Sequence, residues 1–188
     1  MCNVTKKELR AEIRTKRLSV ENKSKKDALI VGHIENLLEI KEAKKVFIFY
    51  PRDTEIDLSP LFVKLKRLGK TVAFPRCFNK KGNMEFFAIN SLDELEAGPF
   101  GILEPPFTTP EIPTDTVIIV PAMAVSRDFH RIGYGCGYYD RYLERYEKYA
   151  PFTISAIYDE FLFDTIPTED FDRRTDAYVS ESGIVQRK

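Results

Sequence analysis

The sequence is poor in the residues that build metal centres and disulfide frameworks. Its three cysteines, Cys2, Cys77 and Cys136, are scattered without C-x-x-C spacing, and there are two histidines. A structural zinc site or a disulfide framework would need more such residues at closer spacing. We therefore expect a reducing, cytoplasmic environment.

Long apolar runs are also missing. No stretch approaches the roughly 20 apolar residues that a membrane-spanning helix needs, and the charged start of the chain lacks the apolar core of an export signal. With 43% hydrophobic and 31% charged residues, the composition is ordinary for a globular protein, so we expect no membrane partner. A chain of 188 residues fits a single domain spanning 1–188.

Neither sign of charge is in excess, because 29 Lys and Arg residues balance 29 Asp and Glu residues. The charges are nevertheless uneven, since residues 1–26 carry nine basic and three acidic side chains. A nucleic-acid-binding protein would be basic more uniformly, and we expect no nucleic-acid partner. The basic start is either a solvated helix face or part of an anion-binding site.

A capping box opens the first expected helix, because the spacing of Thr5 and Glu8 lets each side chain satisfy a backbone donor of the first turn. Leu9 and Ile13 would form the inner face of this helix. Four basic residues then fall close to one side, at spacings of three or four: Lys6, Arg10, Arg14 and Arg17.

Hydrophobic periodicity predicts the remaining elements. A second helix follows Ser24, with an apolar stripe of Ile30, Ile34, Leu37 and Leu38. A third, closed by Gly69, has an inner face of Leu61, Leu65 and Leu68. Strands are expected over 46–50, 71–74, 84–89, 117–120 and 152–158, with a turn over 81–83. The alternation predicts a three-layer, Rossmann-like α/β fold, with an open, mostly parallel sheet and helices on both faces.

Residues 99–113 contain five of the eleven prolines and are expected to form an irregular connection. Four apolar residues are predicted to pin this connection to the body of the protein: Phe100, Ile102, Leu103 and Phe107.

The segment Arg131–Asp140 holds three of the nine glycines, at positions 133, 135 and 137. Each would cost roughly 0.5 to 1 kcal/mol inside a regular element, so we expect a turn between a strand ending at Pro121 and a helix over 138–148. Such a turn can direct backbone N–H groups at a phosphate, with Arg131 adding a second contact. The alternative is a tight turn that packs two tyrosines, Tyr138 and Tyr139, against the sheet.

Asp140 would lie in the first turn of that helix. A phosphate 4 Å away would repel it by about 4 kcal/mol at an effective dielectric of 20, and a bridging Mg²⁺ would relieve this repulsion. Tyr134 is the candidate for stacking on a flat ligand. Cys136 has no activating base nearby in sequence, and His130 either contacts phosphate or is simply exposed. A packed face is indicated by tyrosines at helical spacing: Tyr138, Tyr142, Tyr146 and Tyr149.

Four segments match motifs of one enzyme family. They are Lys6–Arg10 (K-x-x-L-R), Phe49–Tyr50 with Glu55, Phe100–Pro105 (F-G-I-x-E-P) and Arg131–Arg141 (R-[LI]-G-x-G-x-G-Y-Y-D-R). Through them the chain resembles the 5-formyltetrahydrofolate cyclo-ligases, or methenyltetrahydrofolate synthetases, over nearly its full length. The resemblance implies an ATP- and Mg²⁺-dependent ligase of one-carbon metabolism that converts 5-formyltetrahydrofolate to 5,10-methenyltetrahydrofolate, ADP and phosphate.

The resemblance also implies the binding residues. ATP would be held by Lys6, Lys7, Glu8, Leu9, Arg10, Arg131, Ile132, Gly133, Tyr134, Gly135, Cys136, Gly137, Tyr138 and Tyr139. The folate would contact Tyr50, Glu55, Tyr134, Gly135, Cys136, Gly137 and Tyr138. The metal would be held by Asp140, with Asp172 matching a C-terminal aspartate of the family that supports the metal or the site.

The chain departs from the family just before Arg131. The family usually reads P-G-L-A-F-D-x-x-G, whereas here Ser126 replaces the Asp and Phe129 the Gly; further on, Cys136 replaces a Gly or Lys. These changes bear on loop shape and turnover rate. The alternative hypothesis is therefore a catalytically impaired relative that binds folate or nucleotide. We expect a monomer in either case.

Overall fold

The computed structural model describes residues 4–78, 82–98 and 101–188. Its central sheet has seven strands, in the spatial order β12 (Gly183–Gln186), β11 (Ala177–Ser180), β9 (Phe152–Ala156), β6 (Thr116–Pro121), β1 (Lys45–Phe47), β2 (Thr71–Cys77) and β3 (Met84–Ala88). The five inner strands are parallel, and the edge strands β12 and β3 are antiparallel to their neighbours. This arrangement confirms the predicted open, mostly parallel sheet.

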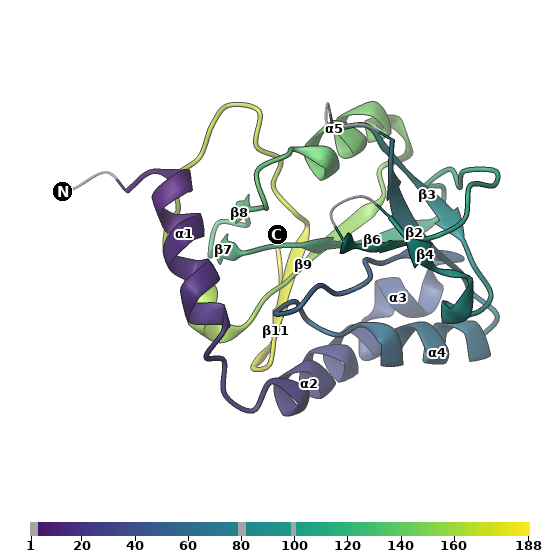
Figure 1. The fold of residues 1–188 in the computed structure, drawn as a ribbon, viewed down its shortest axis with the longest axis horizontal. Coiled ribbons are helices and arrows are strands. Elements are labelled where there is room, and N and C mark those ends of the chain that lie inside the picture. Colours follow the sequence, from purple (N-terminus) through teal and green to yellow (C-terminus); the bar gives the residue numbers. More distant parts are fainter. Residues whose placement is uncertain (1–3, 79–81, 99–100) are drawn as a thin grey trace.

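Helices cover both faces of this sheet (Figure 1). The helices are α1 (Lys6–Arg17), α2 (Lys23–Asn36), α3 (Leu38–Glu42), α4 (Ser59–Arg67) and α5 (Tyr138–Arg145). Side chains of β1 alternate between the faces, since Val46 packs with Ile30 and Leu61 on the side of α2 and α4, whereas Phe47 packs with Tyr142 of α5. A strand covered on both faces is apolar throughout, as the run 46–50 predicted.

Helix α1 begins as its sequence predicts. The Thr5 side chain accepts a hydrogen bond from the backbone N–H of Glu8, and the Glu8 carboxylate accepts one from the N–H of Thr5, which completes the capping box. Leu9 and Ile13 are buried as expected, with 7% and 1% of their surface exposed. Arg17 is buried as well, with 4% exposed, although the sequence placed it with the other basic residues on one side of the helix.

Several predicted helix ends and inner faces are wrong. Helix α2 ends at Asn36 because Leu37 adopts an extended conformation, and Leu38 begins α3 with 61% of its surface exposed. Leu68 is 66% exposed because α4 has already ended where the chain enters the left-handed turn at Gly69. Helix α5 stops at Arg145 and is followed by a 3-10 turn, Glu147–Tyr149; two further 3-10 turns span Leu92–Glu94 and Asp159–Phe161.

The proline-rich connection is held less tightly than predicted. Ile102 is half-buried, but Leu103 and Phe107 are exposed; the Phe107 ring packs against exposed Phe78 and against the buried Phe87. The predicted anchor Phe100 and the start of the predicted turn over 81–83 lie outside the described residues. Among the residues described, no helix combines the length and apolar character needed to cross a membrane.

Two small sheets were not predicted. One joins β10 (Leu162–Phe163), β7 (Ala124–Ser126) and β8 (Arg131–Ile132), and the other joins β4 (Glu96–Ala97) and β5 (Leu103–Glu104). The β7–β8 hairpin lies between the end of β6 and the glycine segment, so the predicted direct passage from strand to glycine turn contains an additional hairpin. This hairpin delivers Arg131 to the edge of the candidate site.

The turn of this hairpin explains how the chain accommodates Phe129. Phe129 has a φ of 72°, a conformation that favours glycine. Its ring packs at 5.5 Å from that of Tyr178, which offsets the strained backbone. Ser126 is fully buried; its hydroxyl donates to the Asp128 carboxylate, and its backbone N–H donates to the His130 carbonyl at 2.9 Å inside the turn. Both departures from the family pattern therefore belong to one internally bonded turn.

Candidate functional site

A cavity of about 760 Å³ opens beside the carboxyl ends of the parallel strands. Its wall combines α1, the loop after β1, the end of β2, the glycine segment and residues 167–172. Ligands of open α/β proteins bind at this edge of the sheet, and the volume lies in the range of small-molecule sites. Segments from the start, the middle and the end of the chain thus line one cavity.

Most of the predicted site residues line this cavity. They are Lys6, Lys7, Arg10, Tyr50, Glu55, Arg131, Gly133, Tyr134, Gly135, Cys136, Gly137, Tyr138, Tyr139, Asp140 and Asp172. The predicted ATP contacts Glu8, Leu9 and Ile132 are not among the lining residues. Glu8 caps α1, while Leu9 and Ile132 pack into the hydrophobic core. These three residues position the segments that carry their neighbours.

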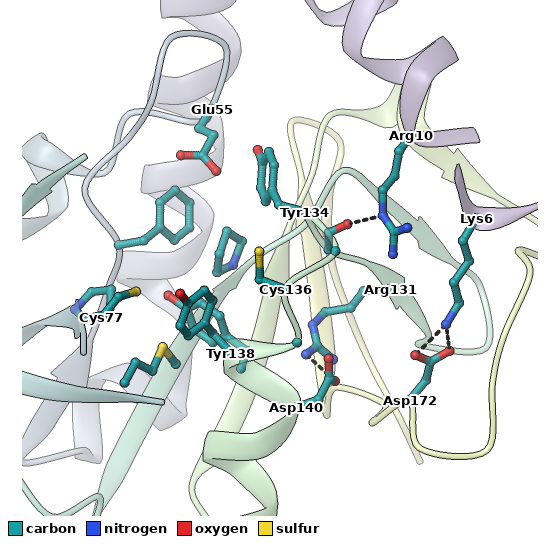
Figure 2. Close-up of a pocket in the computed structure, with 18 of the residues that line it drawn as sticks. Lys6, Arg10, Glu55, Cys77, Arg131, Tyr134, Cys136, Tyr138, Asp140 and Asp172 are labelled. Carbon is teal, nitrogen blue, oxygen red and sulfur yellow. Dashed lines mark hydrogen bonds and ion pairs between the residues drawn. The ribbon is translucent and has the colours of Figure 1, made fainter. Parts of the chain in front are cut away.

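One part of the wall, which we call the basic end, is formed by Lys6, Arg10, Arg131 and the glycine segment. Figure 2 shows the first three side chains converging from α1 and β8. Lys6 Nζ lies 2.5 Å from Asp172 Oδ2 and 2.6 Å from Glu169 Oε2. Arg10 Nε donates to the carbonyl of Gly133 at 2.8 Å. The basic side of α1 therefore faces the cavity here, as the anion-binding interpretation expected.

Arg131 and Asp140 form a pair at the same end. Arg131 is 7% exposed; its Nη2 donates to Asp140 Oδ1 at 2.7 Å, and its Nη1 donates to the carbonyl of Arg173 at 2.6 Å. The guanidinium is thus already engaged, whereas the sequence suggested that it would be available for a bidentate phosphate contact. It also compensates the charge of Asp140, which the sequence left bare.

The glycines of the segment differ in backbone conformation. Gly135 has a φ of 104° and Gly137 a φ of 64°, whereas Gly133 has no positive φ. Gly137 is the N-cap of α5 and supplies no side-chain hydrogen bond to its first turn. Backbone N–H groups at such a helix start attract anions. The left-handed conformations explain two of the three glycines.

The opposite part of the wall, which we call the Glu55 end, is formed by Phe49, Tyr50, Glu55 and Tyr134. Glu55 is 8% exposed, and its Oε2 accepts a hydrogen bond from the backbone N–H of Arg52 at 2.8 Å. Figure 2 shows the hydroxyl of Tyr134 turned toward this carboxylate. Burial raises the pKa of Glu55, while the Tyr134 hydroxyl and the charges of Arg17 and Arg52 oppose that rise.

The tyrosines divide as their spacing predicts. The Tyr134 ring is 40% exposed in the cavity, a position that suits stacking on a flat ligand. Tyr142, Tyr146 and Tyr149 pack on one another, with ring centroids 4.7 and 6.0 Å apart. Tyr139 packs against Phe86 of β3. The helical repeat is thus largely a packed face.

Two cysteines line the cavity, in different environments. Burial, followed by the charge of Glu104, raises the pKa of Cys77 to about 12, which keeps the thiol protonated. Cys136 is exposed on the glycine segment. His130 lies in the β7–β8 turn, where Nδ1 is 2.9 Å from Asp128 Oδ2, and it is not among the residues lining the cavity.

The donor set for a metal is small. Asp140 and Asp172 line the same cavity, but no group of three His, Cys, Asp or Glu side chains with metal-binding geometry occurs in the described ranges. This set fits Mg²⁺, which commonly takes one or two carboxylates and completes its octahedron with phosphate oxygens and water. It does not fit a metal held by protein ligands alone.

Sequence reasoning missed several lining residues, notably Arg14, Phe49, Arg52, Glu104, Glu169 and Phe171. Glu104 stands in the Phe100–Pro105 motif and is 2% exposed, so the motif was a usable signal. Glu169 belongs to the acidic C-terminal region, whose pairing with Lys6 depends on a contact between the chain ends. No pattern of neighbouring residues in the sequence predicts such a contact.

Comparison with known proteins agrees with this geometry. The model of the 5-formyltetrahydrofolate cyclo-ligase family matches residues 3–181. A 5-formyltetrahydrofolate cyclo-ligase of Escherichia coli K12 is 30% identical over 76% of this chain and 80% of its own, and that of Mus musculus is 24% identical over 95% of both. The Aquifex aeolicus 5,10-methenyltetrahydrofolate synthetase superposes with a TM-score of 0.83 at 28% identity, covering 96% of this chain and 92% of its own. The chain therefore belongs to the 5-formyltetrahydrofolate cyclo-ligase family.

Proposed function

We propose that this protein binds ATP at the basic end of the cavity and 5-formyltetrahydrofolate at the Glu55 end, and that it converts them to 5,10-methenyltetrahydrofolate, ADP and phosphate. One observation carries the proposal: a single cavity combines the basic side of α1 and the glycine turn with a buried carboxylate on the opposite wall. The first set suits phosphates, and the second suits the N–H groups of a pterin ring.

The phosphates would lie at the turn Gly133–Gly137. There the N–H groups at the start of α5 and the cations of Lys6 and Arg10 provide positive charge. Lys6 is bound to Asp172 and Glu169, so nucleotide binding would exchange one set of anionic partners for another. The folate ring would stack on Tyr134 and donate hydrogen bonds to Glu55, with Tyr50 beside it.

This placement brings the reacting groups together. The formyl oxygen is a poor leaving group, and transfer of the γ-phosphoryl group onto it releases ADP and makes the formyl carbon electrophilic. The N10 amine then attacks that carbon and loses its proton to solvent, and phosphate leaves with the former formyl oxygen. The protein contributes positioning and charge neutralisation, which are the main catalytic terms in phosphoryl transfer.

Asp140 and Asp172 are the residues that would hold Mg²⁺, which when bound neutralises phosphate charge. Arg131 positions Asp140 through their 2.7 Å contact, and Lys6 positions Asp172. We further propose that the chain acts as one domain and as a monomer in the cytoplasm. The scattered cysteines, which show no disulfide or zinc spacing, support that location.

A coupled assay tests the proposal. With ATP, Mg²⁺ and 5-formyltetrahydrofolate, methenyltetrahydrofolate absorbance should grow in proportion to ADP. Absence of product from folded protein at saturating substrates would contradict it. Calorimetry then separates the alternative, because a catalytically impaired relative would bind both ligands without consuming ATP.

A further inference from the structure

Arg17 is a buried cation whose guanidinium reaches the back of the Glu55 end. It extends from the last turn of α1 with 4% of its surface exposed. Its Nη2 donates to the carbonyl of Ala122 at 2.5 Å, and its Nη1 donates to Tyr134 Oη at 3.1 Å. The guanidinium also lies over the Phe161 ring, 5.4 Å from its centroid. Arg17 is therefore fixed on three sides.

The contact with Arg17 determines the direction of the Tyr134 hydroxyl. An arginine can only donate hydrogen bonds, so the tyrosine oxygen accepts from Nη1 and its own proton points elsewhere. The hydroxyl is turned toward the Glu55 carboxylate, and it opposes the rise in the pKa of Glu55 that burial causes. The resulting order of donors runs from Arg17 through Tyr134 to Glu55.

The charged and titratable residues around Glu55 come from separate elements. Arg52 lies in its own loop, Arg17 comes from α1, and Tyr134 and Tyr139 come from the glycine segment and the start of α5. Arg17 and Arg52 favour the ionised carboxylate, whereas burial opposes it. Since Arg52 belongs to the same loop, Arg17 is the cation that ties Glu55 to the rest of the protein.

We propose that Arg17 is a positioning residue for substrate binding, which acts through the Tyr134 hydroxyl to hold Glu55 oriented for the N–H groups of the folate ring. The inference rests on the proposed placement of folate at the Glu55 end. A merely structural Arg17, anchoring α1 through Ala122, would affect stability and leave folate affinity unchanged.

The test compares Arg17→Leu, Arg17→Lys and Tyr134→Phe by calorimetric titration with 5-formyltetrahydrofolate and, separately, with ATP and Mg²⁺. Removing a hydrogen bond that supports a charged group is expected to weaken folate binding about tenfold in Arg17→Leu, with partial recovery in Arg17→Lys and ATP affinity within about twofold of wild type. In the Tyr134→Phe background, Arg17→Leu should weaken folate binding by less than a further factor of about two, because the two changes break one chain of contacts.

The pH dependence of folate binding gives a second readout. The pH below which folate binding is lost should move upward in Arg17→Leu, since a positive charge beside Glu55 is gone.

Asp27→Asn is the matched control. It weakens another buried polar contact, the hydrogen bond from Tyr158 Oη to Asp27 at 2.6 Å, away from the cavity, and should lower stability without changing folate affinity. Equal folate affinity of Arg17→Leu and wild type, or additive effects of Arg17→Leu and Tyr134→Phe, would overturn the inference while leaving the proposed function intact. Failure of the wild-type protein to bind folate would overturn both.

Discussion

The two ends of the cavity are prepared for ligands in different ways. At the basic end, Lys6 and Arg131 already hold carboxylates, at 2.5 and 2.7 Å. At the Glu55 end, the carboxylate is set by a backbone N–H of its own loop and by a tyrosine hydroxyl, and it retains acceptor capacity. Under the proposed function, the basic end would therefore exchange partners when phosphate binds, whereas the Glu55 end is already formed.

The two ends thus hold their carboxylates in different ways. Ion pairs at the basic end neutralise the half-buried Lys6 and the buried Arg131. Under the proposed function, each carboxylate would turn to the metal ion when the nucleotide binds. The Glu55 end instead keeps a carboxylate in a buried place, at the cost of a raised pKa. Substitutions should therefore affect stability and nucleotide binding at one end and folate binding at the other.

The largest expected effect is that of Arg131→Met at the basic end. The substitution leaves Asp140 and the Arg173 carbonyl without their buried donor, and loss of one partner of a buried pair costs about 3 to 5 kcal/mol. Denaturant unfolding should show that loss in the free energy of unfolding. Arg145→Met, which removes a more exposed pair with Glu85, should cost about 1 kcal/mol or less. Equal losses of unfolding free energy in the two variants would contradict a larger contribution from the buried pair.

Of the two substrates, Lys6→Met should affect only the nucleotide. We expect the KM for ATP to rise about 10- to 100-fold, the value of one charge-assisted hydrogen bond, with the folate KM within about twofold of wild type. Lys16→Met, on the exposed side of α1, is the control and should change neither constant. A rise of the folate KM in Lys6→Met would contradict the claim that each end of the cavity binds a different substrate.

Glu55→Gln should show the reverse pattern. It keeps the shape but loses the charge that accepts N–H groups, so 5-formyltetrahydrofolate should bind about tenfold more weakly while ATP binding is unchanged. Titration calorimetry with each ligand measures both effects. Unchanged folate affinity would show that the carboxylate is structural.

The glycine segment offers a matched pair of substitutions. Gly135→Ala forces a side chain into a φ of 104° and should cost about 1 to 2 kcal/mol of stability. Gly133→Ala has no positive φ and no atom within 4 Å of the added carbon, so it should leave the melting temperature almost unchanged. Similar melting temperatures for both variants would contradict the strained turn at the basic end.

The smallest effect is a pH dependence of stability at the Glu55 end. Because folding raises the pKa of Glu55 above its ordinary value of 4.5, the ionised carboxylate is less favourable in the folded state. Wild type should lose stability relative to Glu55→Gln as pH rises through that raised pKa, and the two should converge below pH 4.5. A gap that widens toward acid pH would reverse the sign and contradict the burial argument.

Much of the framework could be predicted because its signals are local. The capping box at Thr5 depends on neighbouring residues and is present in the structure. The apolar run expected over 46–50 is buried as far as Phe49, although strand β1 covers only Lys45–Phe47. The exposure of Leu38 and Leu68 could not be predicted, because it depends on where the helices end.

Site residues that belong to a sequence motif could be predicted, whereas contacts between distant segments could not. Lys6 pairs with Asp172 across the whole chain, and Arg17 reaches Tyr134 from the end of α1. No spacing in the sequence encodes either contact. The burial of Arg17 in particular follows from the position of the Ala122 carbonyl, which the unpredicted hairpin β7–β8 helps to place.

The most direct test of two distinct ends is hydrogen-exchange mass spectrometry with one ligand at a time. A non-hydrolysable ATP analogue with Mg²⁺ should alter exchange in residues 133–140 and 169–173, where the Lys6–Asp172 pair is exchanged, and leave 49–55 unchanged. 5-Formyltetrahydrofolate alone should protect 49–55 and leave 169–173 unchanged. Protection of 49–55 by the nucleotide, or a change at 169–173 caused by the folate, would contradict the account.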